Sequence, residues 1–256
     1  MLDYDAEAVR YDDTRGGVPR AAAAAQAVLG LVPEHARTLL DVACGTGLVT
    51  ARYARPGLRV LGLDAALGMA RMAARRVGPA VVLGDSRRLP FATGRLDAVS
   101  AVWLLHLLPD AAAVVAECAR VLRPGGVFIA TVDKDAAHDV GSDIDALLAP
   151  FRTRRAYDAE HLVAEYGARH GLRPHGEALF TGYGQGRSPL RTAADIESGY
   201  FASSLAVDAA GANRLIERLR ALPDPDKPRP DPVYRLLALR RTLSTAVARW
   251  PVRAPS

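Results

Sequence analysis

The hydrophobic residues in the first half of the chain fall into short runs separated by longer amphipathic segments. Runs of strand length cover 38–43, 58–63, 80–84, 96–102 and 126–132. Segments with helical periodicity cover 47–54, 66–77 and 111–122, and an alanine-rich segment that Pro19 opens predicts an earlier helix, 19–31. Short apolar strands that alternate with helices indicate a parallel sheet covered on both faces.

This alternation ends after Val132. Helical patterns then cover 141–152, 158–170 and 192–221, and strand candidates cover 176–182 and 233–239. The segment 223–232 is so rich in proline that it predicts a stiff, solvated, polyproline-like connection. Residues 1–17 are polar, and we assign no element to them.

Composition narrows the class of protein. The chain has 256 residues, half of them hydrophobic, and a net charge of +5, which excludes a wholly disordered chain. Two cysteines, Cys44 and Cys118, lie in apolar segments, which excludes a disulfide scaffold and suits a reducing cytoplasm. No apolar run is long enough to span a bilayer, and the acidic first residues are unlike a signal peptide. We therefore expect a cytoplasmic protein without a membrane partner.

The excess of basic over acidic residues does not indicate that nucleic acid is a partner. The arginines are scattered among acidic residues, and no run of basic and aromatic residues occurs. Only two of the 33 cationic side chains, Lys134 and Lys227, are lysines, and alanine is abundant. We interpret this as the bias of a GC-rich genome.

The segment Leu39–Gly47 carries the chemistry. It reads as a strand with an acid, Asp41, then a glycine turn, then a helix start. A phosphate-binding P-loop is excluded, because no Gly-Lys-Ser/Thr follows. The dinucleotide fingerprint fits badly, because Thr50 occupies its third glycine position. An acid followed by small residues and Gly-x-Gly remains.

Four further segments follow at suitable spacing. They are Leu61–Asp64, Gly84–Ser86 with Leu89-Pro90-Phe91 behind it, Leu96–Val99 and Val121–Gly126. Together with the glycine segment they resemble class I S-adenosylmethionine (SAM) dependent methyltransferases, in particular the small-molecule group that includes quinone-biosynthesis methyltransferases. The resemblance covers 38–133. One departure is Ala43, which stands where many members carry the first motif glycine.

The resemblance implies a Rossmann-like α/β fold, with a seven-stranded, mostly parallel sheet, an antiparallel last strand, helices on both faces and a helical insertion that covers the substrate. SAM is the implied cofactor. Asp64 would accept hydrogen bonds from both ribose hydroxyls, as a carboxylate can, and Asp85 would receive the adenine amino group. The residues assigned to the cofactor are Asp41, Ala43, Cys44, Gly45, Gly47, Asp64, Ala65, Met69, Gly84, Asp85, Ser86 and Trp103.

Several of these positions have a second interpretation. Asp41 would act at one remove by orienting the loop, Cys44 would be a small loop residue, and Met69 and Trp103 would be ordinary core residues. Tyr11 and Arg15, with Arg20 beside them, would form a lid over the carboxylate of SAM. Equally, the tyrosine would pack its ring and the arginines would be solvated.

Methyl transfer from SAM needs alignment and exclusion of water more than a base. His106, after the fourth predicted strand, is the base candidate, with a cofactor-side or structural role as the alternative; His138 is the next. No set of carboxylates with metal-ligand spacing is evident, so we expect no metal. Acceptor specificity is assigned to 134–160 and 183–222, whose notable side chains are Tyr157, Tyr183, Gln185, Arg187, Tyr200 and Phe201. The tyrosines and Arg187 would suit an aromatic or anionic small molecule, and the same residues would equally suit a helix–helix interface.

The predicted organisation is an N-terminal lid and helix (1–37), a SAM-binding core (38–135), substrate-covering helices with the last strands (136–240) and a basic tail (241–256). The predicted function is methyl transfer from SAM to a small organic acceptor, in secondary metabolism. The alternatives are an RNA or protein methyltransferase and a non-catalytic SAM-binding regulatory subunit. The acceptor, the atom methylated and the oligomeric state are left open.

Overall fold

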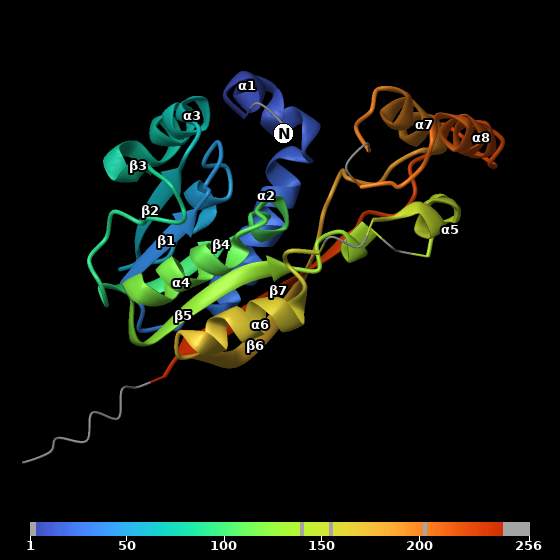
Figure 1. Cartoon of the computed structure of the whole chain (residues 1–256). Helices are drawn as coiled ribbons and strands as arrows, with labels where there is room; N and C mark the ends of the chain where they lie inside the picture. Colours follow the sequence, from blue (N-terminus) through green and yellow to red (C-terminus); the bar gives the residue numbers. More distant parts are fainter. Residues whose placement is uncertain (1–3, 139–140, 154–155, 202–203, 243–256) are drawn as a thin grey trace, which may run out of the picture.

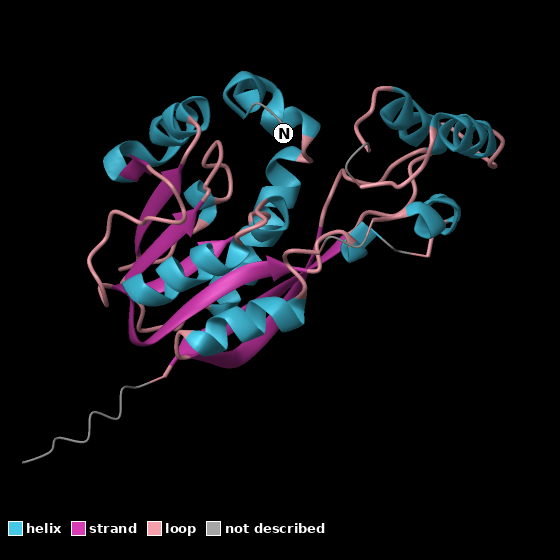
Figure 2. Ribbon diagram, in the orientation of Figure 1, coloured by secondary structure: helices cyan, strands magenta, loops and turns pink. Residues whose placement is uncertain are grey.

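A single sheet runs through the protein in the computed structural model, which describes residues 4–138, 141–153, 156–201 and 204–242 (Figures 1 and 2). Its strands are β1 (Thr38–Val42), β2 (Arg59–Asp64), β3 (Val81–Leu83), β4 (Leu96–Ala101), β5 (Leu122–Val132), β6 (Leu172–Thr181) and β7 (Val233–Arg241). Their order is β3-β2-β1-β4-β5-β7-β6, and β7 is antiparallel to both of its neighbours. The predicted fold class is confirmed.

Successive side chains of a strand point to opposite faces of the sheet, so hydrophobic cores form on both faces. In β5, Phe128 and Ala130 face α4 (Ala111–Val121) and α6 (Glu160–Arg169). The intervening Val127 and Ile129 face α2 (Gly17–Leu31). All four side chains are fully buried. Helices on both faces explain why the strands read as continuous apolar runs instead of alternating ones.

Two helix predictions need correction. The segment 47–54 is not a helix: Gly47 has φ +76°, and only a 3₁₀ turn, Thr50–Arg52, follows. The segment 192–221 is two helices, α7 (Pro189–Glu197) and α8 (Ala209–Arg220). Gly199, at φ +75°, stops the first, and the Asp208 carboxylate caps the second by accepting from Gly211 N at 2.7 Å.

Of three other helices, one has no counterpart in the sequence predictions, one is shorter than predicted and one is as predicted. The polar N-terminal segment forms a helix, α1 (Tyr4–Thr14), for which we assigned no element. The predicted helix at 141–152 is shorter, α5 (Asp143–Leu148), followed by a 3₁₀ turn, Ala149–Phe151. α3 (Leu67–Val77) packs beside β2 and β3, as the pattern over 66–77 predicts.

A separate, smaller core lies beyond the carboxyl end of β5 and the amino end of β7. We call residues 141–153 and 182–232, apart from 202–203, the helical module; it contains α5, α7 and α8 (Figure 1). Its buried side chains include Ile144, Leu148, Phe201, Leu215 and Leu219. Because these residues contact one another and not the sheet cores, the module packs as a unit beside the sheet.

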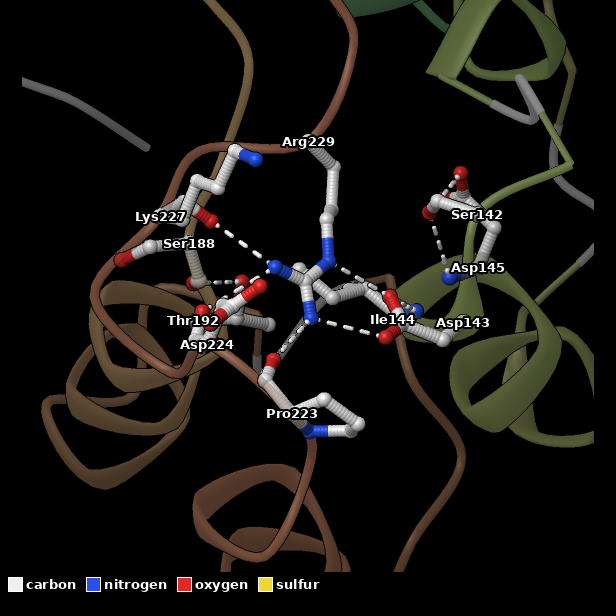
Figure 3. Close-up of polar contacts among 10 residues, drawn as sticks. All are labelled: Ser142, Asp143, Ile144, Asp145, Ser188, Thr192, Pro223, Asp224, Lys227 and Arg229. Carbon is white, nitrogen blue, oxygen red and sulfur yellow. Dashed lines mark hydrogen bonds and ion pairs between the residues drawn. The ribbon is translucent and has the colours of Figure 1, made fainter.

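The proline-rich segment 223–232 turns back onto α5, which corrects the prediction of a polyproline-like connection, whereas most of its residues are solvent-exposed, as predicted. The Arg229 guanidinium makes two 2.7 Å bonds to the Asp143 carboxylate of α5 (Figure 3). It also donates to the carbonyl oxygens of Pro223, Asp224 and Lys227. A planar guanidinium with five donors can satisfy several acceptors at once, so one side chain closes the segment into turns.

Among the described residues, no helix is both long and apolar enough to cross a bilayer. Residues 243–256, most of the predicted basic tail, lie outside the described part. The division into four segments stays a prediction.

Candidate functional site

The glycine loop, residues 43–49, leaves the carboxyl end of β1. Ala43, Gly45 and Gly47 all have left-handed backbones, with φ of 56°, 57° and 76°. Gly47 also approaches α3 closely, since a Cβ there would lie 2.8 Å from Ala73 Cα. Alanine tolerates a left-handed backbone only at an energetic cost. Ala43, the departure from the family pattern, is therefore strained where glycine would be relaxed.

Asp64, the last residue of β2, anchors this loop. Its carboxylate accepts from Gly45 N at 2.8 Å and from Ala66 N at 2.9 Å, and only 8% of the residue is exposed. Burial raises the pKa of the carboxyl, and the backbone N–H groups oppose that rise. Each oxygen keeps further lone-pair capacity, so the carboxylate can still accept from a diol. The next residue, Ala65, is exposed.

Asp41 lies beneath the loop and does not reach the surface. Its two oxygens accept from the hydroxyls of Thr50 (2.6 Å) and Ser100 (2.8 Å), and the residue is 3% exposed. Burial raises the pKa of Asp41 to about 6. Since both oxygens are occupied inside the protein, this geometry favours the interpretation that Asp41 orients the loop.

Cys44 and Met69 are buried. Burial raises the pKa of the Cys44 thiol well above its usual value, and the sulfur packs against Gly62. A thiol with a raised pKa is a poor nucleophile. Met69, on α3, is 1% exposed. The geometry of both residues favours the packing interpretation.

Gly84, Asp85 and Ser86 follow β3. Gly84 N donates to Asp64 O at 2.9 Å, which holds this turn beside the end of β2. The Asp85 carboxylate is paired with Arg87, which also bonds Asp110 at 3.1 Å. The Arg87 guanidinium lowers the pKa of Asp85. An adenine amino group would therefore share this carboxylate with an exposed arginine.

Helix α1 is fastened to the glycine loop, a contact that the sequence did not reveal. The Thr46 hydroxyl donates to Asp12 at 2.6 Å, and Arg76 pairs with the other Asp12 oxygen at 2.5 Å. Near the other end of α1, Asp5 accepts from Gly68 N at 2.5 Å. The partners lie more than thirty residues away along the chain, so no local pattern predicts these bonds. They hold α1 across the loop, where a lid would lie.

A cationic and aromatic cluster adjoins this lid. The Arg15 guanidinium lies 5.8 Å from the Tyr11 ring and donates to the Tyr200 hydroxyl at 2.9 Å. Arg20 lies 3.5 Å from the Trp103 ring centroid and donates to Arg15 O at 2.7 Å. The structure thus brings together the predicted lid residues Tyr11, Arg15 and Arg20.

Trp103 is held in an unusual conformation. Its φ is 56°, and its backbone N–H donates to Thr131 Oγ1 at 3.1 Å. Its ring packs edge-on against Phe180 and Tyr234, each with a centroid distance of 5.5 Å. A left-handed tryptophan is strained, and such strain concentrates at functional sites.

His106 lies in a 3₁₀ turn after β4, beside the same cluster. Burial, with the nearby Lys134 charge, lowers the pKa of His106 to about 3. The imidazole is therefore neutral at pH 7, and a conjugate acid with so low a pKa makes it a weak base in this arrangement. Its role as a base stays a prediction. The side chain of His138 lies outside the described part.

Four of the buried polar atoms without a hydrogen-bond partner gather here, counting only described residues. They are Arg15 Nε, Arg20 Nε, Trp103 Nε1 and His106 Nδ1. A buried donor left unpaired costs about 1–3 kcal/mol, so such a group indicates a place where a ligand or water completes the site. Within the same described ranges, no cluster of three or more metal-ligating side chains occurs.

Comparison with known proteins agrees with this geometry. Residues 40–130 match the methyltransferase domain family. The demethylmenaquinone methyltransferase of Corynebacterium kroppenstedtii is 40% identical over 96 residues, which are 38% of this chain and 42% of that protein. The chain thus spans less than half the length of that relative.

Solved structures share the whole fold. The cyclase SpnF superposes with a TM-score of 0.60 at 18% identity, covering 94% of each chain. The geranyl diphosphate C-methyltransferase of Streptomyces coelicolor, solved with S-adenosyl-L-homocysteine, has a TM-score of 0.53 at 17% identity, covering 94% of this chain and 85% of that one. Residues 40–130 therefore match a methyltransferase domain, and the two solved structures share the fold of the chain.

Proposed function

We propose that this protein is an active SAM-dependent methyltransferase that methylates a small organic acceptor. The observation that carries the proposal is the pairing of a left-handed glycine loop with the buried Asp64 carboxylate at the carboxyl ends of β1 and β2. In open α/β sheets, ligands bind at this edge of the sheet. The methyltransferase domain match covers the same residues.

Each part of the site has a task under this proposal. Asp64 would hold the ribose hydroxyls, Asp85 the adenine amino group, and Tyr11 and Arg15 the carboxylate of the methionine moiety. SAM supplies a methyl group that its sulfonium makes electrophilic. The backbone amides of Cys44, Gly45 and Gly47 already donate to acceptors within the protein. The carboxylate of the methionine moiety would therefore need other donors, such as Arg15. Helix α1, fastened to the loop, would exclude water from the transfer.

The acceptor would lie between Trp103, His106 and the helical module. The arginine and alanine bias supports secondary metabolism as its setting, and the two free buried cysteines support a reducing compartment such as the cytoplasm. A cyclase with this fold shows that methyl transfer does not follow from the fold. Turnover must therefore be tested apart from cofactor binding.

Calorimetric titration with S-adenosylhomocysteine tests the cofactor site. We expect Asp64→Ala to weaken binding by about tenfold to a hundredfold, because the ribose hydroxyls would lose their acceptor. Asp195→Ala is the matched control, since Asp195 pairs with Arg191 on α7, which carries none of the residues assigned to the cofactor. Equal dissociation constants for Asp64→Ala and the wild type would contradict the ribose assignment.

Transfer of a labelled methyl group tests the activity. We expect label to move from SAM to at least one small acceptor and not to RNA or protein. Label in a macromolecule would favour the RNA or protein methyltransferase. Binding of S-adenosylhomocysteine without turnover on any acceptor would favour a non-catalytic module.

A further inference from the structure

The cluster beside the lid holds more positive charge than the protein itself balances. Arg15, Arg20 and Arg187 come from α1's end, α2 and the loop before α7. None of the three has a carboxylate within ion-pair distance among the residues that the structure describes. Arg20 is only 7% exposed, and Arg15 and Arg187 are partly buried. Cations withdrawn from water without counter-charges are costly, so this cluster favours the binding of an anion.

Tyr200 marks where the charges of Arg15 and Arg187 meet. Its hydroxyl accepts from Arg15, and the Arg187 guanidinium lies 5.8 Å from its ring and 4.8 Å from the ring of Phe201. Burial would raise the pKa of Tyr200, but the Arg15 hydrogen bond and the charges of Arg15, Arg187 and Lys134 outweigh it and lower that pKa. The nearest cations therefore surround one phenol that is itself half exposed.

Backbone contact holds the two sides of this cluster in place. A Cβ on Gly16 would lie 2.2 Å from Tyr183 O, and one on Gly184 would lie 3.4 Å from Gly16 Cα. The turn that follows Arg15 therefore touches the loop that carries Arg187. Two glycines at positive φ permit this approach. The cationic side chains are thus set by packed backbone instead of free loops.

SAM brings one carboxylate, which cannot balance three arginines. We propose that the second anion is on the acceptor: the protein binds a small aromatic acceptor whose carboxylate, or a similar oxyanion, lies between Arg187 and Arg15 beside Tyr200. This inference rests on the proposed function. Arg187 belongs to the helical module and not to the glycine loop, so it separates acceptor binding from cofactor binding. The rings of Tyr200 and Phe201 provide the aromatic surface.

Calorimetry on the full chain saturated with S-adenosylhomocysteine tests the inference. Benzoate is the anionic probe, and benzamide is the neutral probe of the same shape. We expect benzoate to bind the wild type at least about tenfold more tightly than benzamide, because charge-assisted hydrogen bonds are stronger than neutral ones. Arg187→Gln should abolish this preference, and Arg187→Lys should keep part of it.

Arg191→Gln is the matched control, since Arg191 lies four residues on and is 73% exposed. It should leave benzoate binding unchanged, and all variants should bind S-adenosylhomocysteine like the wild type. Equal binding of the two probes, no benzoate binding, or an equal loss in Arg191→Gln would each overturn the inference. So would a parallel loss of S-adenosylhomocysteine in Arg187→Gln, which would place Arg187 at the cofactor. Failure of the wild type to bind S-adenosylhomocysteine would instead overturn the proposed function.

Discussion

The proposed cofactor site and the proposed acceptor site, called here the cofactor side and the acceptor side, are built in different ways. On the cofactor side, the glycine loop, Asp64 and the Gly84 turn are joined by backbone N–H groups, and Gly45 and Asp64 are only 19 residues apart. On the acceptor side, long side chains join distant segments: Arg15 meets Tyr200 across 185 residues, and Arg229 meets Asp143 across 86. The first region can be predicted from the sequence because it depends on local backbone geometry. The second cannot, because it depends on which distant segments pack together.

The two regions should also differ in how substitutions change the stability of the protein. Backbone bonds in the loop depend on φ and on close approach, so a single methyl group disturbs them. The helical module depends on charged side chains that close a small core. We therefore expect substitutions on the cofactor side to affect the global free energy of unfolding, and those on the acceptor side to open the module alone.

Gly47→Ala should have the largest effect. The added Cβ would lie 2.8 Å from Ala73 Cα in a backbone at φ +76°. We expect the free energy of unfolding in urea to fall by about 2–4 kcal/mol, because steric strain adds to the left-handed cost. Gly94→Ala is the matched control: its φ is +70°, and no atom lies within 4 Å. Equal losses in the two variants would show that close approach to α3 contributes nothing.

Arg229→Gln should act on the helical module. Losing both bonds to Asp143 should lower the opening free energy of this region by about 1–3 kcal/mol. Hydrogen exchange should therefore speed up by about tenfold or more in α5, α7 and α8 and stay unchanged in β1 and β4. Arg220→Gln is the control, because its pair with Glu197 is half exposed on both sides. Faster exchange in the sheet as well would contradict a separate module.

Asp41→Asn should change the pH dependence of stability. The native carboxyl keeps its proton up to about pH 6, whereas the unfolded one titrates near about pH 4. Between these values the native state binds more protons, so this group's contribution to wild-type stability falls as pH rises. Relative to the wild type, the variant should gain on the order of 1–3 kcal/mol between about pH 4 and 7.

Urea unfolding of both proteins across this range measures that difference. Below about pH 6.5 the buried neutral His106 lowers stability as pH falls, because the unfolded histidine takes up a proton, but it does so in both proteins and cancels. A constant difference between the two curves would refute the raised pKa of Asp41.

Ala43→Gly should have the smallest effect, and its sign is opposite to that of Gly47→Ala. Glycine relieves the left-handed backbone at φ 56° but has a more flexible unfolded state. We expect a net gain of about 0.5–1 kcal/mol in thermal or urea unfolding. A loss of stability would mean that packing of the Ala43 methyl group stabilises the protein more than its strained backbone costs. That methyl group contacts the core on the α4 and α6 face of the sheet.

The sequence by itself determined the sheet and the glycine loop at the carboxyl ends of its parallel strands. All seven strand candidates form, and the central strands are recognisable because a strand buried on both faces is a run of apolar residues. Gly45 and Asp64 meet because parallel strands end at one edge of the sheet. The sequence could not place Asp12 on Thr46, split 192–221 into two helices, or turn the proline-rich segment back onto α5.

Those features depend on which distant surfaces dock. Arg15, Arg187 and Tyr200 carry no shared pattern along the chain, and only the packing of the Gly16 turn on the Tyr183 loop brings them together. Hydrophobic periodicity records what each segment buries, and it does not record which neighbour covers it. The sheet and the glycine loop were therefore visible in the sequence, whereas the surroundings of the proposed acceptor were decided by the tertiary structure.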